Sequence, residues 1–188
     1  MLIGIGAQKT GTTWLYEYLT KHNDVFMTPY KETHVFDHRH NYSADNFRDI
    51  LLNRVINLST DINKRKGKRC SERYRRAINT IEKIAMIDDL NIYIDHFQQR
   101  VKQEKIFGEI TPAYSLLPKK GFNEILSLHP KVKFIFIMRD PVDRAWSHIN
   151  DESERKGIKL SDQEKIEKIF NASNKNKNAY YLKSNYEA

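Results

Sequence analysis

The chain has 188 residues, enough for one domain with a substantial core and too few for two of ordinary size. Hydrophobic residues make up 39% of the sequence and charged residues 30%, which excludes a chain that is disordered throughout. No apolar run approaches the ~18 residues of a membrane-spanning helix, and the N-terminus lacks the basic region of a signal peptide. Because Cys70 is the single cysteine, no intrachain disulfide can form. We therefore expect a cytoplasmic protein.

The net charge of +8 is concentrated in one segment. Between Asp61 and Arg76, eight Lys and Arg residues stand against two acidic residues, which gives this segment 8 − 2 = +6. Such a segment can hold an acidic acceptor, a nucleic acid or a membrane surface, or it can be the solvated face of a loop and a helix. We favour the solvated face and expect no nucleic-acid partner.

The first predicted unit is a strand, a glycine-containing turn and a helix. Residues 2–6 form a short apolar run that ends in glycine, which is typical of a buried strand. After Gly11, apolar residues from Trp14 to Leu19 recur at the spacing of one helix face.

The middle of the chain, residues 38–105, is predicted to be a helical insertion within the domain. Three amphipathic stretches follow one another there, and the third runs from Leu90 to Val101. Ser43 and Ser71 are the candidate N-caps of the first two helices.

Strands are predicted again toward the C-terminus. Ile106 and Phe107 enter a short strand that we expect to end at Gly108. Residues 132–138 are nearly all apolar, which is typical of a strand covered on both faces of a parallel sheet. Pro141 suits the first turn of a following helix. Strands that alternate with helices predict an α/β fold with a parallel sheet.

The turn after the first strand has the composition of a phosphate-binding loop. Its backbone N–H groups and the helix N-terminus create positive potential, and its glycines let a phosphate approach the backbone closely. Lys9 adds a full positive charge, and the threonine hydroxyls can donate further hydrogen bonds. The candidate phosphate-binding residues are Gln8, Lys9, Thr10, Gly11, Thr12 and Thr13.

This loop differs from the Walker A motif of ATPases and kinases. That motif places a lysine directly after a glycine and before Ser or Thr, and no such tripeptide occurs in the chain. Here Lys9 precedes Gly11. The order of residues argues against a metal-dependent kinase, although a nucleotide kinase remains an alternative.

The segment Gln-Lys-Thr-Gly-Thr-Thr-Trp at residues 8–14 resembles the 5'-phosphosulfate-binding loop of sulfotransferases that use 3'-phosphoadenosine 5'-phosphosulfate (PAPS). A second signature of that family is a strand followed by Arg and, eight residues later, Ser, which contact the 3'-phosphate. Residues 134–147 resemble it, with Arg139 at the strand end and Ser147 in the next helix. The planar guanidinium of Arg139 suits a phosphate.

Two further segments resemble the glycan-type members of the family. In Lys-Glu-Thr-His-Val-Phe-Asp at residues 31–37, the resemblance makes Glu32 the catalytic base, and His34 is the second candidate or its partner. A carboxylate within reach is required because the acceptor must lose a proton as it attacks sulfur. In residues 108–114, the resemblance implies that Thr111 and Tyr114 line the acceptor side, although both residue types also serve in packing.

The resemblance implies a P-loop-NTPase-like three-layer fold, with a central parallel sheet flanked by helices. It implies in-line transfer of a sulfuryl group from PAPS to an acceptor hydroxyl or amine, with a saccharide as the expected class, PAP as product and no metal. We interpret residues 1–188 as one sulfotransferase domain that lacks the usual C-terminal portion. A non-catalytic basic module that binds polyanions is the other alternative, and the oligomeric state stays open.

Overall fold

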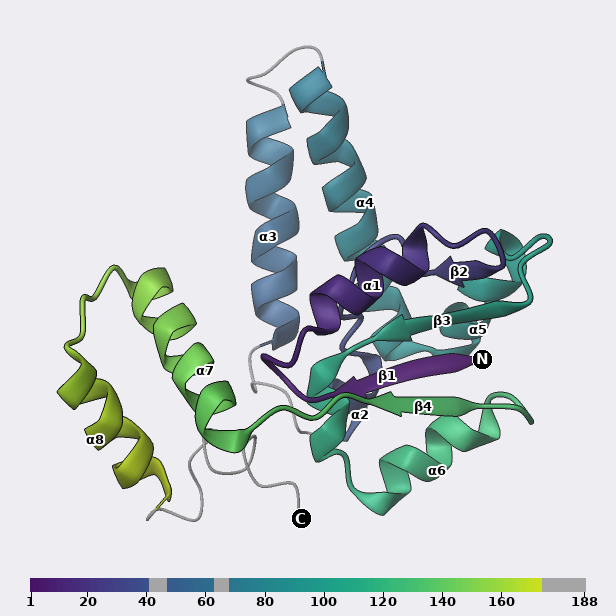
Figure 1. The fold of residues 1–188 in the computed structure, drawn as a ribbon. Coiled ribbons are helices and arrows are strands. Elements are labelled where there is room, and N and C mark those ends of the chain that lie inside the picture. The colour runs from purple at the N-terminus through teal and green to yellow at the C-terminus, as the bar shows by residue number, and fades with distance from the viewer. Residues whose placement is uncertain (41–46, 63–67, 174–188) are drawn as a thin grey trace.

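The computed structural model describes residues 1–40, 47–62 and 68–173, which form an α/β fold (Figure 1). In chain order its elements are β1 (Leu2–Gly6), α1 (Thr12–Thr20), β2 (Val25–Met27), α2 (Val35–Arg39), α3 (Phe47–Ile62), α4 (Lys68–Asp88), α5 (Leu90–Arg100), β3 (Ile106–Ile110), the 3-10 helix η1 (Pro112–Leu116), α6 (Lys119–Ser127), β4 (Lys133–Phe136), α7 (Pro141–Lys156) and α8 (Asp162–Ser173).

The four strands form one sheet in the order β2-β3-β1-β4, and every neighbouring pair is parallel. Ile3 of β1 is in register with Glu109 of β3 on one side and with Phe134 of β4 on the other. Because all strands run in one direction, their carboxyl ends meet at the same edge of the sheet. The predicted α/β fold with a parallel sheet is confirmed.

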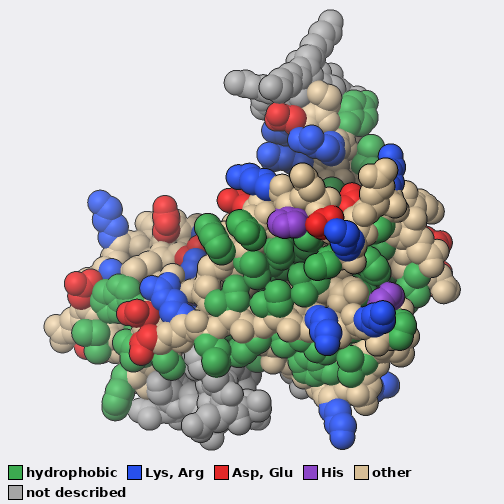
Figure 2. Space-filling view, turned by 45° about the vertical axis from the view of Figure 1, so that its right-hand side comes forward, with side chains coloured by type: hydrophobic (Ala, Val, Ile, Leu, Met, Phe, Trp, Pro, Cys, Tyr) green, Lys and Arg blue, Asp and Glu red, His purple; other side chains and the backbone are tan. Residues whose placement is uncertain are grey.

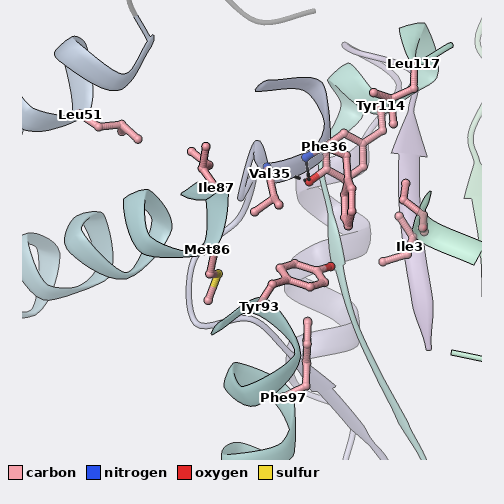
Figure 3. Close-up of a cluster of buried hydrophobic side chains, with 11 residues drawn as sticks. Ile3, Val35, Phe36, Leu51, Met86, Ile87, Tyr93, Phe97, Tyr114 and Leu117 are labelled. Carbon is pink, nitrogen blue, oxygen red and sulfur yellow. Dashed lines mark hydrogen bonds between the residues drawn. The ribbon is translucent and has the colours of Figure 1, made fainter. Parts of the chain in front are cut away.

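Helices cover both faces of the sheet. On one face, α1 packs Leu15 and Leu19 against a small cluster that includes Val25 and Ile110. On the other face, α2, α4, α5, η1 and α6 surround the larger core, where Tyr93 and Phe97 of α5 lie beside each other (Figure 3). This three-layer arrangement agrees with the expected architecture.

Gly108 lies inside β3 because the strand continues to Ile110, so the prediction that the strand ends at this glycine is wrong. A Cβ atom at Gly108 would lie 1.7 Å from the Leu2 carbonyl oxygen of β1. Glycine therefore permits the close approach of two central strands, and it does not mark a strand end.

The apolar run at residues 132–138 is a shorter and more exposed strand than its sequence predicts. The strand β4 covers only Lys133–Phe136, and it lies at the edge of the sheet. Phe134 packs against Phe122 of α6, whereas Phe136 is 39% exposed and Met138 is 69% exposed. The prediction that both faces are covered is wrong, because no residue of β4 is fully buried: Lys133 and Phe136 are exposed, and Phe134 and Ile135 are partly buried.

Helices α3 and α4 form an antiparallel hairpin that projects from the sheet (Figure 1). Helix α4 begins at Lys68, so Ser71 lies within its first turn and the prediction that it is the N-cap is wrong. Ser43 and most of the basic segment lie outside the described residues or their described side chains. Lys and Arg side chains gather on the hairpin next to the segment that is not described (Figure 2). The assignment of residues 38–105 as an insertion stays a prediction.

Candidate functional site

The loop between β1 and α1 is held at its start by the end of the neighbouring strand. The Ile137 N–H donates to the Gly6 carbonyl at 2.8 Å, and the Ala7 N–H donates to the Ile137 carbonyl at 3.0 Å. Further along, the Thr10 hydroxyl donates to the Ala7 carbonyl at 2.7 Å, which closes the turn. Gly11, with a φ of 92°, is the N-cap residue of α1. Only glycine adopts this left-handed conformation without strain, so the residue type is explained by the backbone.

Residues 139–144, which lead into α7, contact the same loop. The Asp140 carboxylate caps α7 by accepting from the Val142 and Asp143 N–H groups. The Arg139 Nη1 donates to the Lys9 carbonyl at 3.3 Å, and the Nη1 of the buried Arg144 donates to the Gln8 carbonyl at 3.4 Å. The two segments that the sequence relates to phosphate binding therefore contact each other.

Lys9 also forms an ion pair with α7. Its Nζ lies 3.1 Å from Oδ1 of Asp151, whose other oxygen pairs with Arg155 at 3.1 Å. The hydrogen bond from Lys9 holds the pKa of the Asp151 carboxyl below its usual range. An anion that binds at Lys9 must compete with this carboxylate for the ammonium group.

A cavity of ≈ 480 Å³ opens between the loop, α7 and the segment after β2. We refer to it as the loop cavity. Eight of the predicted site residues line it: Gln8, Lys9, Gly11, Thr12, Thr13, Glu32, Arg139 and Ser147. Lys31, Pro112, His148, Asp151 and Arg155 complete the lining. Thr10, whose hydroxyl donates to the loop backbone, is absent from the lining. The cavity thus unites cationic and hydroxyl groups with one candidate base.

Glu32 is carried to the cavity by the segment that crosses the carboxyl end of β3. Its N–H donates to the Ile110 carbonyl at 3.1 Å. Its carboxylate accepts from Lys31 and lies 3.5 Å from Nε2 of His34, whose Nδ1 is 2.7 Å from the buried Asp37. The hydrogen bond with His34 is the main cause that lowers the pKa of Glu32 to about 2, even though burial opposes this shift.

His34 lies outside the cavity lining but controls the charge of its wall. Burial alone would lower its pKa, but the hydrogen bonds and charges of Asp37 and Glu32 raise it to about 9. The imidazole is therefore protonated at neutral pH, and it cannot accept a further proton. His34 thus serves to orient and ionise Glu32.

Three of the predicted site residues have a left-handed backbone conformation. Among the described residues, the non-glycine positions with positive φ are Lys9 at 65°, Glu32 at 62° and His34 at 60°. Each of these conformations costs of order 1 kcal/mol or more and persists only where the surroundings enforce it. All three residues are candidates from the sequence, so the strain coincides with the candidate site.

Thr111 and Tyr114 are both completely buried and do not line the loop cavity. Both hydroxyls donate to the buried Glu109 carboxylate, at 2.8 Å and 3.0 Å, and Tyr93 donates to it at 2.9 Å. The Thr33 N–H donates to the Thr111 Oγ1 at 3.0 Å. The implied contact of Thr111 and Tyr114 with an acceptor therefore has no support, because their hydroxyls are used to anchor the segment beside Glu32.

Sequence reasoning missed two residues that hold the site together. Lys83 of α4 donates to the backbone carbonyls of Lys31 and Glu32, and burial lowers its pKa to about 8. No local pattern relates this helix to Glu32, so the sequence carries no signal for it. Asp151 follows Ser147 by one helical turn, and this i, i+4 spacing could have placed both on one helix face.

A parallel sheet with a phosphate-type loop between the first strand and the first helix defines a P-loop-like α/β protein. Within this class, the sulfotransferase family model matches residues 2–182, and the chain belongs to that family. The crystal structure of a sulfotransferase from Alicyclobacillus acidocaldarius is similar in fold, with a TM-score of 0.61 and 20% sequence identity.

The structural alignment covers 97% of this chain and 62% of that chain, so the present sequence spans less than two thirds of its structural relative. No curated protein matches the sequence. Within the described residues, no group of three or more His, Cys, Asp or Glu side chains has the arrangement of a metal site. None of the described helices is long and apolar enough to cross a membrane.

Proposed function

We propose that this protein transfers a sulfuryl group from PAPS to an acceptor hydroxyl or amine, releasing PAP. The observation that carries the proposal is the loop cavity, in which Lys9, Arg139, Ser147 and Glu32 all take part. Two phosphate-type segments from opposite ends of the described chain meet there next to a carboxylate. Membership in the sulfotransferase family supports the same reaction class.

Donor binding would use the two walls of the cavity. The loop N–H groups and Lys9 would hold the 5'-phosphosulfate and stabilise the charge that develops on the departing phosphate. Arg139 and Ser147 would hold the 3'-phosphate and so fix the position of the donor along the cavity. The ion pair of Lys9 with Asp151 would open as the donor binds, because the ammonium would then face the more highly charged phosphosulfate.

Acceptor activation would use Glu32. In the transfer step the acceptor oxygen or nitrogen forms a bond to sulfur, and the bond from sulfur to the bridging phosphate oxygen breaks. The acceptor proton goes to the Glu32 carboxylate, and the electron pair of the broken bond leaves with PAP. A carboxylate with a pKa of about 2 is a weak base, so it accepts the proton late, when bonding to sulfur has made the acceptor strongly acidic.

Of the two candidate bases, the electrostatics favour Glu32 over His34. A histidine with a pKa of about 9 already carries the proton that a base must accept. The proposed acceptor class is a saccharide, which rests on the resemblance of residues 31–37 to glycan-type sulfotransferases. The expected cytoplasmic location and the absence of a metal requirement belong to the same proposal.

The donor site is tested by thermal unfolding with PAP, in parallel with ATP and magnesium. Ligand at about 100 times its dissociation constant stabilises by about 2.7 kcal/mol, or roughly 5–10 °C for a domain of this size. We expect a shift with PAP, and its loss in Lys9→Ala and Arg139→Ala. Lys105→Ala is the control, because Lys105 is an exposed lysine paired with Asp24 before β3, outside the cavity.

Two outcomes would contradict the proposal. A shift with ATP and magnesium but none with PAP would indicate a nucleotide kinase. Equal PAP shifts in Lys9→Ala and in the Lys105→Ala control would remove Lys9 from the donor site. In either case the assignment of the loop to phosphosulfate would be wrong.

A further inference from the structure

A second cavity, of ≈ 530 Å³, lies between the segment after β2 and the two helices of the projecting hairpin. We refer to it as the basic cavity. Its lining comprises Tyr30, Lys31, Arg54, Leu58, Arg76, Asn79, Thr80 and Lys83. Half of these residues are cationic, and they come from three separate parts of the chain. Lys31 lines both cavities, so the basic cavity adjoins the place where Glu32 lies.

No carboxylate lines the basic cavity within the described part of the chain. Two carboxylates contact the lining from outside it and are themselves paired: Glu32 with Lys31 and His34, and Glu82 with Tyr30, His96 and Arg100.

Two cations of the basic cavity, Lys83 and Arg54, repel each other. Burial is the main cause that lowers the pKa of Lys83; the charges of Glu109 and Glu32 oppose this shift, and the charge of Arg54 adds to it. Like charges that converge in one concave site cost free energy, and a bound anion removes that cost. Arg54 and Arg76 form no ion pair with the described residues, so their guanidinium groups are available to such an anion. A guanidinium also matches the geometry of phosphate, sulfate or carboxylate oxygens.

We propose that the basic cavity binds an anionic group of the acceptor, such as a phosphate, sulfate or carboxylate, so that the acceptor's hydroxyl or amine reaches past Lys31 to Glu32. This inference rests on the proposed function, because it treats the loop cavity as the donor site. It narrows the acceptor class from any hydroxyl or amine to a molecule that also carries negative charge.

Arg54 and Arg76 are the residues to change in a test. Both side chains are exposed, so glutamine at these positions should leave the fold intact. Lys31 and Lys83 are unsuitable, because they contact Glu32 directly or through its carbonyl. Arg48→Gln is the matched control, because Arg48 is also on α3 but pairs with Asp88 away from the cavity.

The first measurement follows amide NMR shifts during titration with inorganic phosphate at constant ionic strength and saturating PAP. PAP occupies the donor site, so the remaining phosphate binding reports the basic cavity. We expect the double variant Arg54→Gln/Arg76→Gln to bind phosphate at least about tenfold more weakly than the native protein. The Arg48→Gln control should bind it normally. Equal phosphate affinity in the double variant and the native protein would overturn the inference.

The second measurement compares glucose, glucuronate and glucose 6-phosphate as acceptors with PAPS, which separates carboxylate from phosphate as the recognised group. We expect the double variant to raise KM for the charged sugars at least about tenfold, with little change in kcat or in the affinity for PAP. Equal KM values for neutral and charged sugars in the native protein would also overturn the inference that the basic cavity binds an anionic group. Failure of the proposed function gives a different result, in which PAP does not bind and phosphate binding still depends on Arg54 and Arg76.

Discussion

Replacing His34 by glutamine should remove a pH-dependent contribution to stability. The imidazole lies between two carboxylates, with Nδ1 2.7 Å from Asp37 and Nε2 3.5 Å from Glu32. These partners outweigh burial and raise its pKa from 6.5 to about 9. A group whose pKa rises on folding stabilises the folded state fully below the pKa of the unfolded chain. This stabilisation is lost as the pH rises through the pKa of the folded protein. The relevant window therefore extends from about pH 6.5 to pH 9.

The stability that His34 contributes can be calculated from its pKa shift. A rise of about 2.5 pKa units at about 1.36 kcal/mol per unit sets an upper limit of about 3.4 kcal/mol. The side chain of Glu32 is 40% exposed, so solvent screens part of its interaction with the imidazolium. We therefore expect about 2 kcal/mol, or roughly 4–8 °C in Tm for a domain of this size.

The assay is urea unfolding of the native protein and His34→Gln from pH 5.5 to pH 9.5. The difference in free energy of unfolding between the two should shrink by about 2 kcal/mol between pH 6.5 and pH 9. The two proteins must be compared at each pH because Lys83 also makes the free energy of unfolding depend on pH. Its pKa is lowered to about 8, so its effect has the opposite sign to that of His34. Its charged form is disfavoured by folding, so its contribution to stability improves as the pH rises above 8.

An NMR titration of the His34 ring in the native protein measures the same pKa directly. A stability difference that does not change with pH would refute this reasoning. So would a His34 pKa at or below 6.5. Either result would also reopen the assignment of the general base, because a neutral histidine could then accept a proton.

Three further predictions concern the core and the chemistry. Glu109→Gln should destabilise the protein by about 2–4 kcal/mol, because the amide nitrogen would meet hydroxyl donors; a loss below 0.5 kcal/mol in urea unfolding (roughly the scatter at neutral surface sites) would contradict it. Gly108→Ala should prevent normal folding, because its Cβ would lie 1.7 Å from the Leu2 carbonyl oxygen; a native circular-dichroism spectrum and Tm would be inconsistent with this packing. Glu32→Gln should leave the PAP thermal shift unchanged and lower kcat by about a hundredfold or more, whereas unchanged turnover would assign the base elsewhere.

The parts of the fold that the sequence predicted correctly are defined by short-range signals. An apolar run, a glycine turn and a helical stripe lie within the first 20 residues, and the structure has β1 and α1 there. The sites at Lys9 and Arg139 could be related because both follow strands, and the carboxyl ends of parallel strands meet at one edge. The exposure of β4 could not be predicted, because it depends on the position of the strand in the sheet.

The segment that carries Glu32 depends on tertiary contacts that no local pattern reveals. Four hydroxyls converge on the Glu109 carboxylate, from the N-cap residue of η1, from η1 itself, from α5 and from the segment before α2, and only the assembled fold brings them together. Thr111 and Tyr114 therefore resemble substrate-contacting residues in the sequence, although both are completely buried in the structure. Buried polar residues of this kind cannot be distinguished from binding residues by type alone.

The proposed donor site in the loop cavity and the proposed acceptor-anion site in the basic cavity are built from different parts of the fold. The donor residues follow β1 and β4, whose ends are fixed to each other by backbone hydrogen bonds. The basic cavity instead takes most of its lining from the α3–α4 hairpin, which holds the site through side chains such as Lys83. Substitutions of hairpin residues that line the basic cavity, such as Arg54 and Arg76, should therefore alter acceptor choice without moving the phosphate-binding loop. Under the proposed function, acceptor choice and donor binding should respond to separate sets of mutations, which double-mutant cycles across the two cavities would measure as additive effects.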